Sequence, residues 1–570
     1  MKKLVYSLAF VAVIALLSGC ASLKKMKENA EEIDYTVEPE VPEMHAGEVA
    51  VTISGKIPEK YFNKKATALI TPVWVYEGGE TAMEPVKVEG EKIEGNNTTI
   101  NFKEGGSFSY SDKVAYKDEM LRSELQIQIT ASKGDESIEF NPYPIAQGIV
   151  ATPALVQVNP KVVAGEDKFQ RDRPASEMAQ FNFDKNKSRL KYSERREEDI
   201  ESLEEYIAQV KEDERKRFDN VKLHGYASPE GPQDLNDELS SDRAEVSKKY
   251  IDDKFKDLED LNETEFFIKH ATKEDWEGFK KLVQESSLEE KDMILRVLQM
   301  HSDVNQREKE FRNMTKVFQT LEKEIHPKLR RTEMKVNITL IGHTNEEIKQ
   351  LVDEDIDSLR KEELFFAATL YDDNAKKLTI YEEFVRQYPE DWRGHNNVGV
   401  TQYNMDNMEA AATAFEKAKA AEANATVHNN LGAMALVDGD IEKAQEHFTS
   451  ATGVGEAASY NMGIVEIKNA NYEKAVSYFG DMCSCNAALA NLLNGNYDEA
   501  VRLAECGDNN DAAMNYYVKA VAGARKGDTE LMFNNLRTAC TKDASLKEHA
   551  ANDVEFIDYM EEQTFKNIVE

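Results

Sequence analysis

The pattern of hydrophobic and polar positions changes its period along the chain, and the first pattern is that of strands. Between residues 47 and 160, apolar residues alternate with polar ones, as in Leu125, Ile127 and Ile129. A period of two predicts strands with one buried face, and glycine-rich turns between the runs predict hairpins. We therefore expect an antiparallel β-sandwich over residues 47–160, with an immunoglobulin-like arrangement as one form of it.

Three residues of this β region allow more specific structural predictions. Pro72 interrupts the apolar run 67–75 and predicts an edge strand or a broken one, because proline cannot donate to a ladder. Trp74 and Tyr76 fit either a stacking platform for a sugar or the buried face of a strand, and both interpretations stay open. No function for this domain follows from its residues.

The second pattern, over residues 172–342, alternates strand and helix. A strand pattern at Phe181 and Phe183 precedes a helical one, and the last alternating run ends at Leu340. This order predicts an α/β split sandwich. A charged helical stretch at about 271–328 is expected to be an insertion that packs outside the sheet.

The third pattern, over residues 362–545, is helical and repeats itself. A small residue is followed by alanine twelve positions later and by an aromatic residue sixteen positions later, and the glycines of the three clearest copies are 33 and 31 residues apart. This spacing resembles tetratricopeptide repeats, in which small residues let two helices approach and the aromatic ring fills the gap to the next repeat. Residues 343–361 are expected to form a linking helix, and 546–570 a capping tail. The three copies are Val398-Gly399, Ala411 and Phe415; Leu431-Gly432, Ala444 and Phe448; and Met462-Gly463, Ala475 and Phe479.

Asparagines recur on the first helix of these repeats. Asn397, Asn430 and Asn461 each precede the two small or apolar residues that open the repeat signature. Repeat arrays present a concave surface to peptides, and a carboxamide can both donate to and accept from a backbone. We expect these residues to bind an extended segment of a protein partner, and the alternative is that they are ordinary polar positions.

The N-terminus carries a short apolar run between charged residues and a cysteine. Lys2 and Lys3 precede a 14-residue apolar run, Leu4–Leu17, which Ser18, Gly19 and Cys20 follow. The run is too short to span a bilayer and is typical of a signal peptide, here residues 1–19.

The end of this signal, at Cys20, resembles the lipobox of bacterial lipoproteins. That resemblance implies that acyl chains such as palmitate are attached to Cys20 and anchor the chain in a membrane. The alternative is an ordinary signal peptide with a chance cysteine. Residues 20–46 are rich in Lys and Glu and are expected to be a flexible linker. The residue after Cys20 is not Asp, and in this respect the chain resembles lipoproteins that are sorted to the outer membrane. We expect the chain to face the periplasm.

The α/β stretch resembles the OmpA-like peptidoglycan-binding family over about 170 residues. The resemblance rests on Phe181-Asn182-Phe183-Asp184, on Gly225-Tyr226-Ala227-Ser228 with Gly231, on Asn236, Leu239, Ser240, Arg243 and Ala244, and on Arg330-Arg331. It implies that the domain binds the diaminopimelate side chain of a peptidoglycan stem peptide, with Arg243 on a carboxylate and Asn236 beside it. The family has Asp where this chain has Ser228, so Glu230 is the candidate replacement.

Two alternatives accompany this resemblance. Arg243 could pair with a local carboxylate, in which case the domain would be only a structural spacer. Residues Gly342-His343-Thr344-Asn345 look like a second copy of the signature, but Thr344 with Glu347 fits a capping box that begins a helix, and we expect the cap.

Composition removes several classes of function. The chain has 71 Lys and Arg against 106 Asp and Glu, a net charge of −35, which excludes a basic footprint for nucleic acid. The sequence has neither a phosphate-binding glycine loop nor a recognisable catalytic or metal-binding motif, so we expect no enzyme, no cofactor and no metal. The four cysteines after Cys20 are expected to be buried thiols, with one disulfide as the alternative; they are Cys483, Cys485, Cys506 and Cys540.

Together these features resemble outer-membrane lipoproteins of the Bacteroidetes. The expected function is a non-enzymatic tether between the outer membrane and peptidoglycan that binds a protein partner through its repeats. Three modest contacts on one chain would reinforce one another through effective concentration. The alternatives are a surface glycan-binding lipoprotein of the SusD type, and an OmpA-like domain that no longer binds the wall and serves as a spacer.

Overall fold

The computed structural model describes residues 22–256, 263–507 and 510–570. The signal peptide and Cys20 lie outside these residues. The chain divides into two compact units, one formed by residues up to Glu166 together with Tyr381–Glu570, and the other by Asp167–Ile380. None of the described helices combines the length and the apolar content that a membrane crossing requires.

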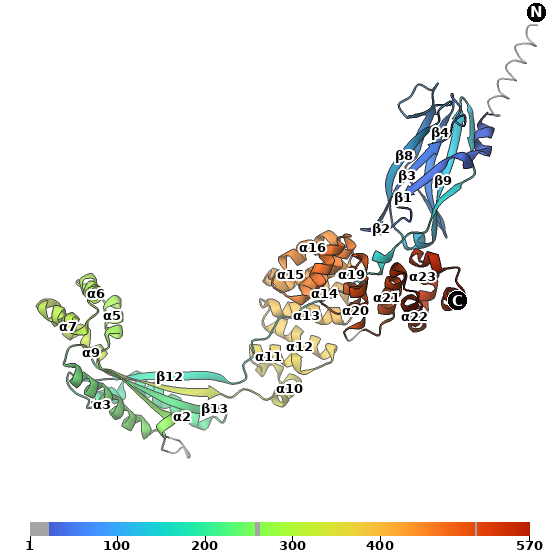
Figure 1. Cartoon of the computed structure of the whole chain (residues 1–570). Helices are drawn as coiled ribbons and strands as arrows, with labels where there is room; N and C mark the ends of the chain where they lie inside the picture. Colours follow the sequence, from blue (N-terminus) through green and yellow to red (C-terminus); the bar gives the residue numbers. More distant parts are fainter. Residues whose placement is uncertain (1–21, 257–262, 508–509) are drawn as a thin grey trace, which may run out of the picture. The chain divides into compact units, whose positions relative to one another are not determined.

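The N-terminal part of the first unit consists of two β-sheets (Figure 1). Apolar side chains from both sheets share one core, in which Trp74 is fully buried, so it is a core residue and not a sugar platform. One sheet contains β1 (Asp34–Glu38), β2 (Met44–His45), β3 (Glu48–Ile57) and β8 (Gly106–Ala115). The other contains β4 (Thr67–Tyr76), β5 (Gly79–Ala82), β6 (Val86–Gly90), β7 (Thr98–Ile100), β9 (Ser123–Lys133), β10 (Glu136–Glu139) and β11 (Tyr143–Gln147).

The predicted flexible linker is wrong for its described part. Leu23, Met26 and Ile33 are buried in the core of the β-sheets, and β1 pairs with β3 along its whole length. The charged residues that suggested a solvated segment lie between these apolar anchors and face outward. Residues 22–46 therefore belong to the β domain.

Pro72 neither breaks β4 nor places it at an edge. The strand pairs with β9 over its full length and with two shorter strands on its other side, β6 at 67–70 and β5 at 73–76. Pro72 lies between these two pairings, and its carbonyl oxygen accepts from Met83 N at 2.9 Å on that side. The missing N–H therefore falls in a gap, where it removes no ladder bond.

The second unit is built on a four-stranded sheet with the order β12-β15-β13-β14. Only β13 and β14 are parallel. One face of this sheet packs against α2 (Glu198–Glu212) and α3 (Gln233–Asp252), whose apolar residues share a core with the strands (Figure 1). The strands are β12 (Arg173–Asn182), β13 (Lys216–Tyr226), β14 (Phe267–Thr272, after the short α4, Glu263–Phe266) and β15 (Arg331–Leu340).

Five short helices lie between β14 and β15 and have an apolar core of their own. Phe279, Val283, Phe311 and Leu321 are buried in it. The helices are α5 (Trp276–Glu285), α6 (Lys291–Met300), α7 (Val304–Asn313), α8 (Thr315–Glu324) and α9 (His326–Leu329).

The unit continues into α10 (Asn345–Glu354) and α11 (Lys361–Ala367). The hydroxyl of Thr344 accepts from Glu347 N at 3.2 Å, and the Glu347 carboxylate accepts from Thr344 N at 2.8 Å. The predicted capping box is thus confirmed, and the second copy of the OmpA-like signature is a helix start.

The C-terminal part of the chain is an array of helix pairs of the tetratricopeptide type. In each clear repeat, a Cβ added to the glycine would clash with the aromatic ring, as for Gly432, where it would lie 2.6 Å from the Phe448 ring. The ring therefore lies over the glycine of its own repeat, and it also packs against the next repeat, since Phe415 shares an apolar cluster with Val427 and Leu431. The helices are α12 (Asn374–Gln387), α13 (Trp392–Asn404), α14 (Met408–Ala421), α15 (Ala425–Val437), α16 (Ile441–Ser450), α17 (Glu456–Lys468), α18 (Tyr472–Phe479), α19 (Cys485–Leu493), α20 (Tyr497–Glu505), α21 (Ala513–Lys526), α22 (Thr529–Lys542), α23 (Ser545–Asn552) and α24 (Gln563–Val569).

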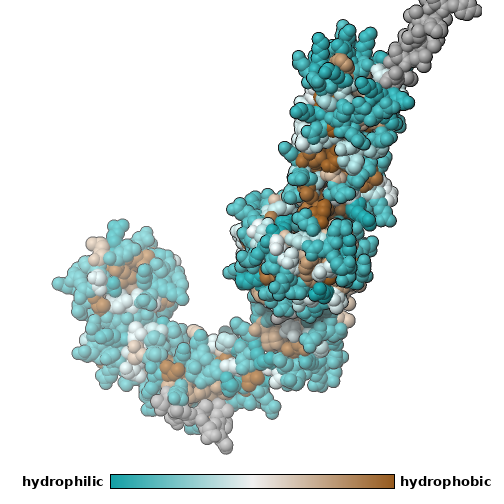
Figure 2. Space-filling model, turned by 45° about the vertical axis from the view of Figure 1, so that its right-hand side comes forward, coloured by the Kyte–Doolittle hydropathy of each residue, from teal (hydrophilic) through white to brown (hydrophobic). Residues whose placement is uncertain are grey.

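The cysteines of the array divide into two kinds. Cys483 and Cys506 form a disulfide, so for these two the expectation of buried thiols is wrong. Cys540 is a buried free thiol and Cys485 is a half-buried one. The visible surface is dominated by hydrophilic residues, in agreement with a sequence in which 31% of residues are charged (Figure 2).

Candidate functional site

An extended segment of the chain lies against the first helices of the repeats. After β11 and a short 3-10 helix, Thr152–Leu155, residues 157–166 have no regular secondary structure. We call residues 157–166 the strap. The predicted β domain, 47–160, therefore ends too late, since its last residues already belong to the strap.

Four asparagines hold the strap by its backbone. Each one accepts from the N–H of a strap residue through Oδ1 and donates to the carbonyl of the same residue through Nδ2. A carboxamide is suited to this because it carries an acceptor and two donors side by side. The pairs are Asn397 with Gly165 (2.7 and 3.1 Å), Asn430 with Val163 (2.7 and 2.7 Å), Asn461 with Lys161 (2.7 and 2.9 Å) and Asn486 with Gln157 (2.8 and 2.8 Å).

These asparagines occupy the same position on successive repeats, on α13, α15, α17 and α19. All four are buried. The strap residues that they hold have odd numbers, as expected for an extended chain in which alternate residues present both backbone groups to the same side. We call the four residues the asparagine ladder.

A second row of asparagines supports the ladder. Asn396 Nδ2 donates to the Val163 carbonyl at 3.0 Å, and Asn429 Nδ2 donates to the Lys161 carbonyl at 2.9 Å. Asn430 Nδ2 also donates to Asn396 Oδ1 at 2.8 Å, which links one repeat to the next. The result is a continuous buried polar network, and such networks fix a single arrangement when their members are satisfied.

Side chains add contacts to this backbone recognition. Pro160 is buried, and its carbonyl accepts from the Tyr403 hydroxyl at 2.9 Å. The Tyr460 hydroxyl donates to Asn159 Oδ1 at 2.7 Å, and its ring lies 4.5 Å from Lys161 Nζ.

The sequence predicts that Asn397, Asn430 and Asn461 hold an extended backbone, and the structure shows that this backbone is the chain's own. An external partner at these residues stays a prediction. Asn486 was missed because its repeat is short. The sequence signal that could have revealed this repeat is the pair Ala488 and Ala500. They are twelve residues apart, like the glycine and alanine of the clear repeats, although Ala488 stands at the glycine position.

The four residues predicted to bind peptidoglycan lie together in the second unit, but their polar groups face the protein. Ser228, Asn236 and Arg243 are 3%, 4% and 1% exposed. Asn236 Nδ2 donates to the Ser228 carbonyl at 3.2 Å, next to Glu230. Binding of a stem peptide by these residues stays a prediction.

Arg243, on α3, binds backbone carbonyls. Its Nε and Nη2 donate to Lys187 O at 3.1 Å each, and its Nη1 donates to Tyr226 O at 2.8 Å. Burial, with Arg330 nearby, lowers the pKa of Arg243 to about 10, so it stays charged at neutral pH. These contacts are with carbonyl oxygens and not with a carboxylate. They do not support the alternative in which Arg243 pairs with a local carboxylate.

Glu230 lies among basic groups, two of them from the end of the helical insertion. Its carboxylate accepts from the Ser228 hydroxyl at 2.9 Å and lies 2.8 Å from His326 Nδ1 and 3.3 Å from Arg330 Nε. Burial opposes its charge, but His326, Arg330 and Ser228 outweigh burial and lower the pKa of Glu230 to about 2. Lys185 Nζ is a further neighbour at 3.6 Å.

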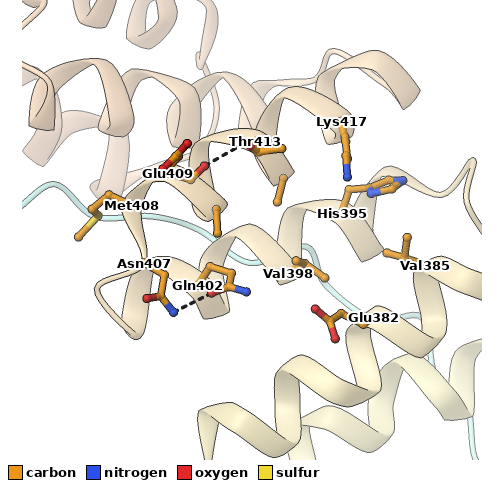
Figure 3. Close-up of a pocket in the computed structure, with 12 residues that line it drawn as sticks. Glu382, Val385, His395, Val398, Gln402, Asn407, Met408, Glu409, Thr413 and Lys417 are labelled. Carbon is orange, nitrogen blue, oxygen red and sulfur yellow. Dashed lines mark hydrogen bonds between the residues drawn. The ribbon is translucent and has the colours of Figure 1, made fainter.

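A hollow of about 740 Å³ lies between α12, α13 and α14 (Figure 3). Val385 and Val398 contribute apolar surface, and Glu382, His395 and Lys417 contribute polar groups. At 100° per residue, the lining residues of α13 lie on the face opposite to Asn397, so the hollow is separate from the strap. Within the described residues, no group of three or more His, Cys, Asp or Glu side chains is placed to hold a metal ion.

No family model and no curated protein sequence matches the chain. Solved structures with partial similarity include a chain of the APC/C hetero-tetramer Cut9–Hcn1, with a TM-score of 0.32 and 13% identity, covering 40% of this chain and 46% of that one. A tetratricopeptide repeat protein from Parabacteroides merdae has a TM-score of 0.26 and 18% identity, covering 40% and 97%. Pseudomonas aeruginosa pilF has a TM-score of 0.28 and 15% identity, covering 38% and 99%. The chain thus spans about half the length of the first of these proteins.

Proposed function

We propose that this chain is a non-enzymatic lipoprotein of the cell envelope and a scaffold for a protein partner. The observation that carries the proposal is the strap in the asparagine ladder. Four repeats bind one segment that leaves the β domain, so the β domain and the array act as one body. A scaffold needs such a fixed connection to hold a partner at a defined place.

Further contacts in the first unit support a fixed connection. The Thr152 hydroxyl, at the base of the strap, donates to the Glu555 carboxylate, which also pairs with Arg525. His45 Nδ1 lies 3.1 Å from the Tyr472 hydroxyl. These contacts join the β domain to the array at residues other than those of the ladder.

The proposed location is the outer membrane, with the chain facing the periplasm and anchored through Cys20. The apolar run before Cys20 supports export and acylation. The disulfide between Cys483 and Cys506 agrees with an oxidising compartment. Replacing Cys20 with serine should move the chain from the membrane fraction to the soluble fraction of cells, and a chain that stays in the membrane fraction would contradict the anchor.

For the second unit we propose a spacer role. The support is that Arg243 is occupied by carbonyl groups and that the Glu230 carboxylate is in contact with His326 and Arg330. The donor groups of Arg243 and the carboxylate of Glu230 are therefore already engaged within the protein. A stem peptide would first have to displace contacts that the protein makes with itself.

Peptidoglycan binding is the second candidate, and the topology of the sheet favours it. The order of β12, α2, β13, α3, β14 and β15 is the one that the OmpA-like resemblance leads us to expect. Sedimentation of the full chain with isolated sacculi separates the two candidates. The spacer predicts no sedimentation, whereas sedimentation that a free diaminopimelate-containing stem peptide reverses would establish the tether.

Limited proteolysis tests the fixed connection. Trypsin cleaves after lysine, and Lys161 is exposed although its backbone is held. Because cleavage requires local release of the backbone, the intact chain should resist cleavage at Lys161, while an Asn430→Ala, Asn461→Ala double variant is cut there. Equal cleavage of both chains would contradict the connection.

A further inference from the structure

The strap shows which kind of segment the groove accepts. We infer that the groove formed by α13, α15, α17 and α19 recognises an extended protein segment of the pattern Asn-Pro-Lys-apolar-x-x-Gly, and that the partner carries this pattern. In the strap it is residues 159–165. The inference rests on the proposed scaffold function and names the chemistry of its partner.

Backbone recognition gives the groove its affinity without regard to sequence. The ladder and its supporting row bind both backbone groups of Lys161, Val163 and Gly165. An occupant must therefore be extended over this stretch. A helical segment uses the same backbone groups internally and does not fit.

Polar side chains of the groove bind the Asn-Pro part of the pattern. Asn159 Oδ1 accepts from the Tyr460 hydroxyl at 2.7 Å and from Asn486 Nδ2 at 3.2 Å. Pro160 is buried, and its carbonyl accepts from Tyr403. Proline also restricts the preceding residue to extended conformations, which prepares the segment for the groove.

The lysine and the apolar residue face two different surfaces. Lys161 Nζ lies 4.5 Å from the centre of the Tyr460 ring, the geometry of a cation–π contact. Val162 packs against the apolar cluster that contains Phe415 and Val427. The groove therefore selects a cation next to an apolar side chain.

The glycine lies close against the side chains of Arg393 and Trp392. A Cβ on Gly165 would lie 3.1 Å from Arg393 Cγ and 3.3 Å from the Trp392 ring. Arg393 cannot move aside easily, because its guanidinium is paired with Asp391 at 2.7 Å and donates to the Glu166 carbonyl. Residues larger than glycine at this position press on these side chains.

The strap protects the groove from weak competitors. A segment tethered at both ends has an effective concentration on the order of millimolar. A free peptide at micromolar concentration therefore does not enter the intact chain. A partner segment gains access when it is held beside the array, or when the strap is weakened. The contacts of Thr152 with Glu555 and of His45 with Tyr472 lie outside the ladder and still join the β domain to the array when the strap is displaced.

The test measures binding of a labelled synthetic peptide of residues 155–168 to the full chain and to a variant whose residues 157–166 are replaced by a ten-residue Gly/Ser linker. The replacement keeps the length, so the linker can span the same distance. We expect no binding to the intact chain and saturable binding to the replaced chain. We expect the affinity to fall by about tenfold or more for peptides with Lys161→Glu or Gly165→Val. Adding Asn430→Ala to the replaced chain should weaken the wild-type peptide similarly.

A scrambled peptide that binds the replaced chain as tightly as the wild-type one would overturn the pattern, as would a folded replaced chain that binds neither. A second variant covers the case in which the replaced chain does not fold. It keeps the strap and carries Lys161→Glu with Gly165→Val, which should open the groove to the wild-type peptide. Failure of this variant to bind also overturns the pattern, whereas the resistance of Lys161 to trypsin in the intact chain tests the proposed scaffold independently.

Discussion

Asn430 binds both backbone groups of Val163, a residue 267 positions earlier in the chain. Oδ1 accepts from Val163 N at 2.7 Å, and Nδ2 donates to Val163 O at 2.7 Å. Asn430 is fully buried, and it is also linked to Asn396 of the preceding repeat. One side chain thus connects the segment that follows the β domain to two repeats of the array.

The first prediction concerns this side chain. Asn430→Ala removes both hydrogen bonds and leaves buried backbone groups of Val163 with fewer partners, which costs about 2 kcal/mol of unfolding free energy. Urea unfolding of the full chain, followed by circular dichroism, measures the loss.

The matched control is Asn407→Ala, in the exposed loop before α14. Asn407 is the N-cap residue of α14, but its side chain makes no capping hydrogen bond; its Nδ2 donates to the Gln402 side chain within the same repeat. Its replacement should change the unfolding free energy by less than about 0.5 kcal/mol, as is usual for surface sites. An equal loss in both variants would show that the ladder contributes nothing specific.

The second prediction concerns the contact between helices within a repeat. A Cβ on Gly432 would lie 2.6 Å from the Phe448 ring, so Gly432→Ala should destabilise the array by about 1–3 kcal/mol through overpacking. The double variant with Phe448→Ala should show a favourable coupling, because the alanine then enters space that the ring has left. Additive losses in this double-mutant cycle, measured by thermal unfolding, would contradict the account.

Positions 488 and 504 show why the sequence revealed some repeats and not others. Ala488 stands where the clear repeats have glycine, and Ala504 stands where they have an aromatic ring. The two substitutions compensate in volume, so the fold is kept while the signature is lost. Asn486 could therefore have been found only through the spacing of twelve that Ala488 and Ala500 keep.

The array and the capping box at Thr344 were predictable because they depend on neighbours close in sequence. The strap was not predictable, because residues 157–166 have neither a period of two nor one of 3.6, and their partners lie more than 200 residues away. The burial of Arg243 was hidden for a related reason. Its partners are backbone carbonyls, which leave no mark in the sequence.

The third prediction concerns pH. The pKa of Glu230 is about 2 in the folded chain, below its usual 4.5, because His326, Arg330 and Ser228 outweigh the burial that opposes its charge. A lowered pKa means that the carboxylate stabilises the fold above pH 4.5 and that this contribution is lost as pH falls from 4.5 towards 2.

The difference in unfolding free energy between the wild type and Glu230→Gln should therefore be largest at about pH 6 and shrink as the pH approaches about 2 to 3. Denaturant unfolding at several pH values measures it. A difference that does not depend on pH would mean that Glu230 is not charged in the folded chain or that its partners do not favour the charge.

The fourth prediction separates a structural role of Arg243 from a binding role. Arg243→Ala leaves the carbonyls of Lys187 and Tyr226 without this donor, so it should lower the unfolding free energy by about 2–3 kcal/mol. Arg217→Ala is the control, because Arg217 is exposed and its ion pair with Asp219 is long, at 3.8 Å. If Arg243→Ala keeps full stability but reduces sedimentation with sacculi, the residue serves binding and the spacer role is wrong.

The most direct test of the central claim is hydrogen exchange of the strap in the intact full chain. The amides of Lys161, Val163 and Gly165 donate to the ladder, and those of Val162 and Ala164 do not. If the ladder holds the strap, the first three amides exchange slowly and the two between them exchange faster, a pattern that residue-resolved mass spectrometry or NMR can distinguish. Rapid exchange at all five amides would show that the groove does not hold the strap, and the account of the scaffold would fail with it.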